Sequence, residues 1–325
     1  DVYKRQALLL STSLFASFSF SDEMILAEQG KVENQYNLGR MYQEGNGVAQ
    51  NDNEAFKWFR KAAQKGHLDA QNELGKMYLF GIGVSKDYKK AVKCFRAAAE
   101  QGYLKSQHNM GTMYNLGRGV QQNYELAFKW WEKAAEQGFA MSQVNIASMY
   151  GEGIGVLKDE KQAFQWMEKA AISGNIKAKH NLAVMYRNGI GVKQSFVDSF
   201  RWYKSAAEQG DPLSQYFYGR AYYDGEGVDQ NFEKAVEWYR KAAEQGDVYG
   251  QAGLGLAYEF GEGVVQDFTE AIRWYKRAAE QGYNRAQYSL GHLYHIGKGV
   301  EQNYDEAYRW HLKAANQGYS ESQYM

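Results

Sequence analysis

The stretch from His67 to Gly102 reads HLDAQNELGKMYLFGIGVSKDYKKAVKCFRAAAEQG, and the chain repeats this phrase with a fixed period of 36 residues. Eight consecutive copies run from Lys31 to Gly318 without an insertion or a deletion. The glycines that end the copies are Gly66, Gly102, Gly138, Gly174, Gly210, Gly246, Gly282 and Gly318. A fixed period of this size is typical of a solenoid built from stacked helix pairs.

The first half of the phrase predicts an amphipathic helix. Ala70, Leu74 and Tyr78 are spaced four residues apart and therefore lie on one helix face. Gly75 lacks a side chain, so a neighbouring helix can approach closely there. The tyrosine recurs in every copy, as Tyr42, Tyr78, Tyr114, Tyr150, Tyr186, Tyr222, Tyr258 and Tyr294. We expect these rings to be buried and their hydroxyls to find hydrogen-bond partners.

A turn follows, written Gly-x-Gly-Val in all eight copies. Gly81 can end the first helix in the left-handed conformation, Gly83 continues the turn, and Val84 anchors it to the core. Three residues after the valine comes a side chain that can cap a second helix. These positions are Asn51, Asp87, Asn123, Asp159, Ser195, Asn231, Asp267 and Asn303.

The second helix carries Ala91 and Ala98 on its predicted buried face, together with position 94. The other seven copies have tryptophan at that position, as Trp58, Trp130, Trp166, Trp202, Trp238, Trp274 and Trp310. We expect this row to be buried, with Cys94 as its one replacement. A reactive thiol needs an exposed, electropositive setting, so we interpret Cys94 as a core residue. A single cysteine also excludes an internal disulfide framework and a cysteine-based zinc site.

The two ends depart from the repeat. Ala7 to Phe20 is apolar, follows Lys4 and Arg5, and is followed by Ser21, which is the layout of a secretory signal peptide over residues 1–21. The alternative is a frayed N-terminal helix. We interpret residues 22–30 as the end of a capping helix, 31–318 as the eight repeats, and 319–325 as a truncated ninth. Fourteen residues are few for a membrane span, and no later segment is apolar enough, so we expect no integral membrane segment.

The charge balance bears on partners and on source. Lysine plus arginine equals aspartate plus glutamate at 38 each, so we expect no binding to nucleic acid. The acceptor pattern Asn-x-Ser/Thr is absent, which for an exported protein favours a bacterial source.

The repeated phrase resembles the Sel-one-like repeat, a 36-residue relative of the tetratricopeptide repeat. The resemblance rests on Leu74-Gly75-x-x-Tyr78, Gly81-x-Gly83-Val84, the spacing of Asp87 and Ala91, and the closing Gly102. It implies an all-α fold, a right-handed α/α superhelix of eight repeats plus a partial ninth. It also implies a non-enzymatic adaptor for other proteins, with bacterial examples often periplasmic or secreted. A protein acting in the cytoplasm is the alternative if the leader is retained.

The resemblance also brings a rival function. One cysteine-rich branch of the family is linked to penicillin binding and β-lactam hydrolysis, which would make the chain a cell-wall-related enzyme. This chain has only Cys94 and departs from that branch.

By analogy with tetratricopeptide proteins, first-helix positions line a concave face that binds a partner. These positions vary between copies while their buried neighbours do not, and we call them the lane. In the fifth to eighth copies, the predicted partner-binding residues of the lane are Lys177, His180, Arg187, Tyr216, Arg220, Tyr223, Tyr249, Glu259, Arg285, Tyr288, His292 and His295. Aromatic and arginine side chains dominate protein interfaces, and the net basic lane favours an acidic or C-terminal-carboxylate peptide. The alternative is that these are ordinary solvated positions and that the interface lies elsewhere.

The sequence offers no catalytic constellation and no cofactor motif. His292 and His295 lie on one helix face, but no third metal ligand is evident, so we expect no metal site. The stretch from Gly291 to Gly299 follows a helix and has the wrong spacing for a phosphate-binding loop. We therefore predict a protein-binding scaffold with no catalytic residues and no cofactor.

Overall fold

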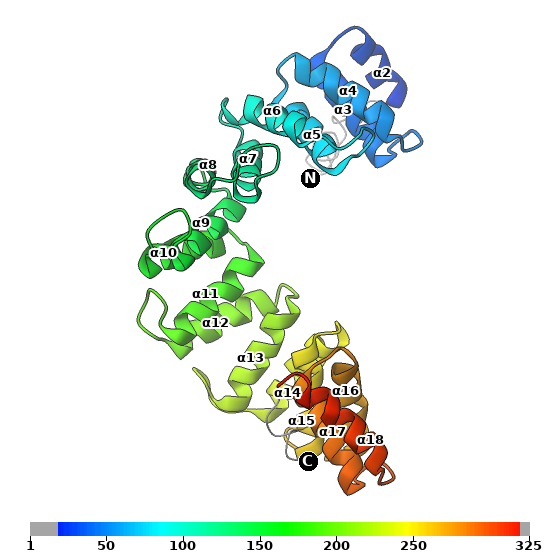
Figure 1. The fold of residues 1–325 in the computed structure, drawn as a ribbon, viewed down its shortest axis with the longest axis vertical. Coiled ribbons are helices and arrows are strands. Elements are labelled where there is room, and N and C mark those ends of the chain that lie inside the picture. Colours follow the sequence, from blue (N-terminus) through cyan, green and yellow to red (C-terminus); the bar gives the residue numbers. More distant parts are fainter. Residues whose placement is uncertain (1–18, 319–325) are drawn as a thin grey trace, which may run out of the picture. The chain divides into compact units, whose positions relative to one another are not determined.

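The computed structural model describes residues 19–318, which form seventeen helices and no strand (Figure 1). The chain divides into two compact units, the N-terminal unit, Asp1–Lys158, and the C-terminal unit, Asp159–Met325. The predicted all-α solenoid of paired helices is confirmed. Most of the expected signal peptide and all of the truncated ninth repeat lie outside the described residues.

The helices follow the repeat. The N-terminal unit contains α2 (Phe20–Glu28), α3 (Val32–Glu44), α4 (Asp52–Gln64), α5 (Leu68–Phe80), α6 (Tyr88–Ala99), α7 (Leu104–Leu116), α8 (Tyr124–Glu136) and α9 (Ala140–Glu152). The C-terminal unit contains α10 (Glu160–Ile172), α11 (Ile176–Asn188), α12 (Phe196–Ala207), α13 (Pro212–Asp224), α14 (Phe232–Glu244), α15 (Val248–Phe260), α16 (Phe268–Glu280), α17 (Asn284–Ile296) and α18 (Tyr304–Ala315). Within each unit, the first and second helix of a repeat pack together, and the second helix also packs on the next first helix.

The turn chemistry is as predicted. Gly81 ends α5 in the left-handed conformation at φ 76°, and all eight predicted capping side chains accept a backbone N–H of their helix. The second glycine of the turn has a further role that the sequence did not reveal. A Cβ on Gly83 would lie 2.1 Å from the carbonyl oxygen of Asp52, in the preceding repeat. The turn therefore sets the spacing between repeats as well as the end of a helix.

The most deeply buried row of large side chains on the second helices is one position beyond the tryptophans. We call it the inner row, and every member is at most 6% exposed: Phe59, Phe95, Trp131, Met167, Tyr203, Tyr239, Tyr275 and His311. Phe95 packs against the glycine of the Leu-Gly pair, since a Cβ on Gly75 would lie 2.5 Å from its ring. This contact confirms that Gly75 allows a helix to approach closely.

The expectation of a buried tryptophan row is correct only in part. Trp58, Trp274 and Trp310 are buried, but the other four are half-buried. The outer side of most of these rings is covered by a basic side chain three residues later, such as Lys241, whose Nζ lies 3.6 Å from the centre of the Trp238 ring. A cation over an indole is stabilising at a partly exposed position. The tryptophans therefore form an outer layer and the inner row forms the core.

Buried glutamines connect successive repeats. In α15, Gln251 Nε2 donates to the carbonyl of Ala243 at the end of α14, at 3.4 Å. Gln281, from the recurring Glu-Gln-Gly ending, donates to Gln251 Oε1 at 2.9 Å. Gln107, Gln215 and Gln287 make the same two bonds. Because a buried amide needs partners, this relay explains why glutamine recurs in the ending.

The leader helix α2 packs on the first repeat, where Ala27 lies in one core cluster with Leu38 and Trp58. α2 begins at Phe20, with Ser19 as its N-cap, and its first turn includes Ser21 and Asp22. The Phe20 ring packs edge-on against Tyr42 at 5.4 Å between centroids. The predicted end of the signal peptide, between residues 21 and 22, therefore lies within the first turn of α2.

Replacing His311 with phenylalanine should stabilise the C-terminal unit. His311 is 5% exposed, and neither ring nitrogen has a hydrogen-bond partner among residues 19–318. Phe59 and Phe95 occupy the same position in other repeats, so the ring fits. We expect His311→Phe to raise the free energy of unfolding by about 1–3 kcal/mol, the usual cost of unsatisfied buried polar atoms. Chemical denaturation at neutral pH measures this gain.

The same substitution should remove a pH dependence. Burial lowers the pKa of His311 below its usual value, and His292 and His295 lower it further. The folded protein thus favours the neutral ring, so stability is full above the usual histidine pKa and falls as the pH drops toward the lowered one. The gain from His311→Phe should grow in mild acid. An equal gain at neutral and mildly acidic pH would contradict this placement of His311.

Candidate functional site: the first-helix face of the C-terminal unit

The lane residues of the C-terminal unit lie on α11, α13, α15 and α17, the first helices of the fifth to eighth repeats. Lys177, Tyr249, Arg285 and His295 are exposed, and the other eight are half-buried. The lane positions therefore differ in how much surface they offer.

Aromatic side chains form a continuous contact network in the middle of this face. Tyr216 stacks on Tyr239 at 5.6 Å and on Tyr249 at 5.5 Å between ring centroids. Tyr249 in turn meets the ring of Tyr283 edge-on at 5.3 Å. Burial raises the pKa of Tyr216, so its hydroxyl stays protonated. We call Tyr216, Tyr249 and Tyr283 the tyrosine floor.

Two arginines accompany the tyrosine floor. Arg220 donates to Asp224 at 3.0 Å on its own helix, in an ion pair that is partly exposed. Arg285 is exposed and forms no hydrogen bond or ion pair with another described residue. Both arginines act electrostatically on Tyr216 and favour its anion, although the effect of burial is larger. Asp224 acts in the opposite direction. The floor is therefore an aromatic surface with two guanidinium groups and one carboxylate nearby.

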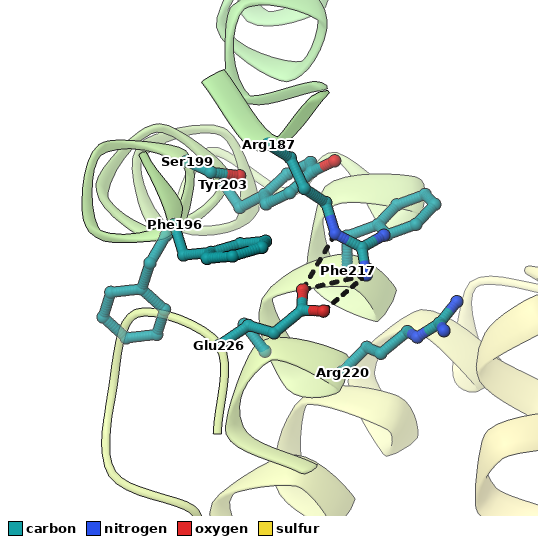
Figure 2. Close-up of a pocket in the computed structure, with 9 residues that line it drawn as sticks. Arg187, Phe196, Ser199, Tyr203, Phe217, Arg220 and Glu226 are labelled. Atoms are coloured by element: carbon teal, nitrogen blue, oxygen red, sulfur yellow. Dashed lines mark hydrogen bonds and ion pairs between the residues drawn. The ribbon is translucent and has the colours of Figure 1, made fainter. Parts of the chain in front are cut away.

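Two other lane residues are engaged with the turn of the following repeat. Arg187 donates through Nε to Glu226 at 2.8 Å and through a terminal nitrogen at 3.0 Å, as Figure 2 shows. The bond to Glu226 raises the pKa of Arg187. Tyr223 donates to Glu262 at 2.5 Å, which together with burial raises its pKa to about 12. These side chains join repeats to each other.

His180 is also committed to a neighbour. Its Nδ1 lies 2.9 Å from the hydroxyl of Ser214, and its ring packs against Tyr203 and Phe217. Burial lowers its pKa, with an opposing effect from Asp211, so the ring is neutral at physiological pH. His180 therefore packs between repeats as an uncharged ring.

The lane of the eighth repeat carries histidines. Tyr288 meets His311 edge-on at 5.3 Å, and His295 meets Tyr304 edge-on at 5.4 Å. Nδ1 of His292 is buried and has no hydrogen-bond partner in the described part of the chain. In the seventh repeat, Glu259 accepts the hydroxyl of Tyr275 at 2.7 Å.

Sequence reasoning missed four residues that shape this face: Tyr283, Glu226, Glu262 and Lys298. The last three occupy the middle of the Gly-x-Gly turn, which we interpreted only as a connector. That position reads Asn46, Ile82, Arg118, Ile154, Ile190, Glu226, Glu262 and Lys298 along the chain. Its variation inside an otherwise constant turn is the signal that could have identified it as part of the surface.

The described residues contain no group of three or more His, Cys, Asp or Glu side chains able to hold a metal ion. Cys94 is half-buried against the core of the first two repeats, and burial raises the pKa of its thiol to about 11. Its thiolate is therefore scarce at neutral pH. No helix among residues 19–318 has both the length and the apolar character that crossing a membrane requires.

Stacked helix pairs with an open first-helix face define the class as a helical-repeat protein, in which each repeat contacts mainly its neighbours. The sequence profile of the Sel1 repeat matches residues 35–67, 68–103, 104–139, 140–175, 176–211, 212–247, 248–283 and 284–319. The chain therefore belongs to the Sel1 repeat family. Proteins of this family are generally scaffolds for protein interaction and are typically non-catalytic.

Two solved structures are similar to the chain along most of its length. One is a protective antigen with an SLR fold, present in uropathogenic Escherichia coli strains, with 36% identity and a TM-score of 0.88. The match covers 94% of this chain and 66% of that one. The other is a Sel1 repeat protein from Oxalobacter formigenes, with 32% identity, a TM-score of 0.70 and coverage of 93% and 88%. None of the curated proteins compared with the sequence matches it.

The pair of Arg187 and Glu226 should couple the fifth and sixth repeats. Both side chains are less than one third exposed, and the bond is bidentate. A double-mutant cycle with Arg187→Ala and Glu226→Ala should give a coupling free energy of about 1 kcal/mol, reduced at high salt. Urea unfolding of the four proteins measures it. Strictly additive effects of the two substitutions would show that the pair does not hold the repeats together.

Proposed function

We propose that the first-helix face of the C-terminal unit binds an extended segment of a partner protein. The observation that carries this proposal is the tyrosine floor, since stacked rings present a large, rigid surface that loses little side-chain entropy on binding. Tyr249, at the centre of the tyrosine floor, is 39% exposed and can contact a partner.

The charges beside the floor favour an acidic segment. Arg285 is exposed and has no acidic partner among residues 19–318. The pair of Arg220 with Asp224 is partly exposed, so water and salt weaken it. An incoming carboxylate can bind either guanidinium group, with the planar geometry that arginine provides. A C-terminal carboxylate or an acidic side chain would satisfy this requirement equally.

The remaining lane residues take a supporting role in this proposal. Arg187 and Tyr223 hold neighbouring repeats together, and His180 packs between them. They therefore fix the spacing of the first helices that present the floor. Lys177 and His295 are exposed and extend the surface at its two ends.

Removing Tyr249 of the tyrosine floor together with Arg285 should weaken partner capture without unfolding the protein. We expect the double variant Tyr249→Ala with Arg285→Ala to capture its partner at least about tenfold less than the unmodified chain, because it removes an aromatic and an arginine contact. Affinity capture from cell extract followed by mass spectrometry measures the loss. Circular dichroism should be unchanged, since exposed substitutions cost little stability.

A matched control uses the same residue types on a second helix. In α18, Tyr308 is 64% exposed. The side chain of Arg309, next to it, is 71% exposed. The variant Tyr308→Ala with Arg309→Ala should keep full capture. Equal loss in both variants, or none in either, would place the interface elsewhere.

We also propose that the scaffold acts outside the cytoplasm. The support is the apolar stretch Ala7 to Phe20 after Lys4 and Arg5. Cleavage after Ser21 would remove the N-cap Ser19 and the contact of Phe20 with Tyr42, so the mature helix would begin less firmly. N-terminal sequencing of protein from cell fractions should find a shortened chain in the exported fraction. A full-length chain confined to the cytoplasm would overturn this.

A further inference from the structure

Grooves at equivalent positions between consecutive first helices differ sharply in volume. Between the fifth and sixth repeats the groove has a cavity volume of only about 10 Å³. Between the seventh and eighth it opens to about 540 Å³. In the N-terminal unit, the groove of the third and fourth repeats measures about 400 Å³. Five lining positions of the first groove recur in the second after a shift of two repeats, where they read Glu259, Phe268, Ser289, His292 and Lys298. The side chains at these shared positions therefore contribute to the difference in volume.

The narrow groove is closed by an ion pair. Arg187 reaches from the end of α11 to Glu226 in the next turn, and both side chains line the groove in Figure 2. The partners are 39 residues apart. Tyr223 and Glu262 have the same separation and are also bonded to each other. A bonded pair at these two positions therefore fills the space between first helices.

The groove of the seventh and eighth repeats has the same two positions with reversed charges, Glu259 and Lys298, but they form no ion pair with each other. The reason is Tyr275, whose hydroxyl donates to Glu259 at 2.7 Å and holds the carboxylate to its own side of the groove. Lys298 instead lies over the ring of Phe268 at 5.1 Å. The ammonium group thus lines an open groove without a carboxylate partner.

The walls of this groove are mainly apolar. They include Leu256, Phe268, Phe260 and Ile296, and the last two are 59% and 37% exposed. Nδ1 of His292, which also lines the groove, is buried without a hydrogen-bond partner among residues 19–318. The lining also includes the polar side chains of Glu259, Gln266, Tyr288, Ser289 and Lys298. A groove of several hundred cubic ångströms with an apolar wall and polar groups beside it can bind a segment that offers both kinds of side chain.

Charge complementarity selects the occupant. From Asn284 to Lys298 the chain carries Arg285, His292, His295 and Lys298 but no Asp or Glu. The one carboxylate on the opposite wall, Glu259, already accepts a hydrogen bond. A segment that combines an apolar side chain with a carboxylate therefore matches this groove best.

We infer that the groove between α15 and α17 is an anchor site for one large apolar side chain of a partner segment, whose adjacent Asp or Glu pairs with Lys298. This inference rests on the proposed binding of an extended segment and names its anchor. The apolar side chain contacts Phe260 and Ile296, and a polar group of the segment reaches Nδ1 of His292.

The groove of the third and fourth repeats provides the contrast. It is similar in volume and has apolar walls such as Leu116 and Ile154, but its only charged lining residue is Glu152. An acidic segment is repelled there. This groove is therefore a matched control for cavity size without the cation.

The experiment selects random peptides from a phage-displayed library on the full chain and measures the binding of synthetic copies by fluorescence anisotropy. We expect the selected peptides to carry a large apolar residue next to Asp or Glu. The variant Glu259→Arg with Lys298→Glu copies the closing pair of the fifth and sixth repeats and should weaken binding about tenfold. The control variant, Asn115→Arg with Ile154→Glu, closes the other groove and should leave binding unchanged.

Charge reversal distinguishes the pairing from a mere loss of fold. Lys298→Glu alone should weaken the acidic peptides about tenfold, and a peptide with Lys in place of its acid should regain most of that loss. If peptides bind the closed variant as tightly as the original but lose affinity for Tyr249→Ala with Arg285→Ala, the anchor site is wrong and the proposed function stands. If no peptide binds above background, both are overturned.

Discussion

The stack depends on one close contact that recurs along the repeats. In it, an inner-row side chain of the second helix packs on the small residue of the Leu-Gly pair in the first helix. Phe95 lies so near Gly75 that a Cβ would come within 2.5 Å of its ring, and Tyr275 holds a similar position over Gly255. Burying an aromatic ring at such a contact provides a large share of the hydrophobic stabilisation available to a two-helix module. The fifth repeat has Ala183 in the same core cluster as Tyr203, so a methyl group is tolerated where the ring can shift.

Local signals in the sequence were sufficient to predict the fold. The helix periodicity, the glycine at Gly81 and the caps such as Asp87 each act within a few residues, and all appear in the structure where they were predicted. The choice between the tryptophans and the inner row was not local. Both rows are apolar and adjacent on the second helix, and only the neighbouring helices determine which one is enclosed. The recurring basic residue three positions after most tryptophans, such as Lys241 after Trp238, is in retrospect a sign of a partly exposed ring.

The candidate site was less predictable, because the lane was assigned by position and not by what each side chain contacts. Arg187 and Tyr223 look like free interface residues in the sequence, yet both bond to the next turn, 39 residues away. The repeat period makes such partners systematic. A residue at the end of one first helix meets the middle residue of the Gly-x-Gly turn in the next repeat. The two positions should therefore have been considered as a pair. The tyrosine floor, by contrast, follows directly from lane residues such as Tyr216 and Tyr249, with Tyr283 added by the structure.

The same pairing rule explains how a uniform scaffold acquires a distinct surface in each repeat. The backbone of every repeat is constrained by the inner row and by glycines such as Gly83, which have no room for a side chain. The inner row varies only among bulky side chains. Positions that neither constraint reaches vary more freely, and the middle of the turn is one of them. A complementary pair there closes the groove, as Arg187 and Glu226 do. The groove stays open where another side chain bonds to one member of the pair, as the Tyr275 hydroxyl does with Glu259. One or two substitutions at these positions can therefore open or close a groove without disturbing the stack.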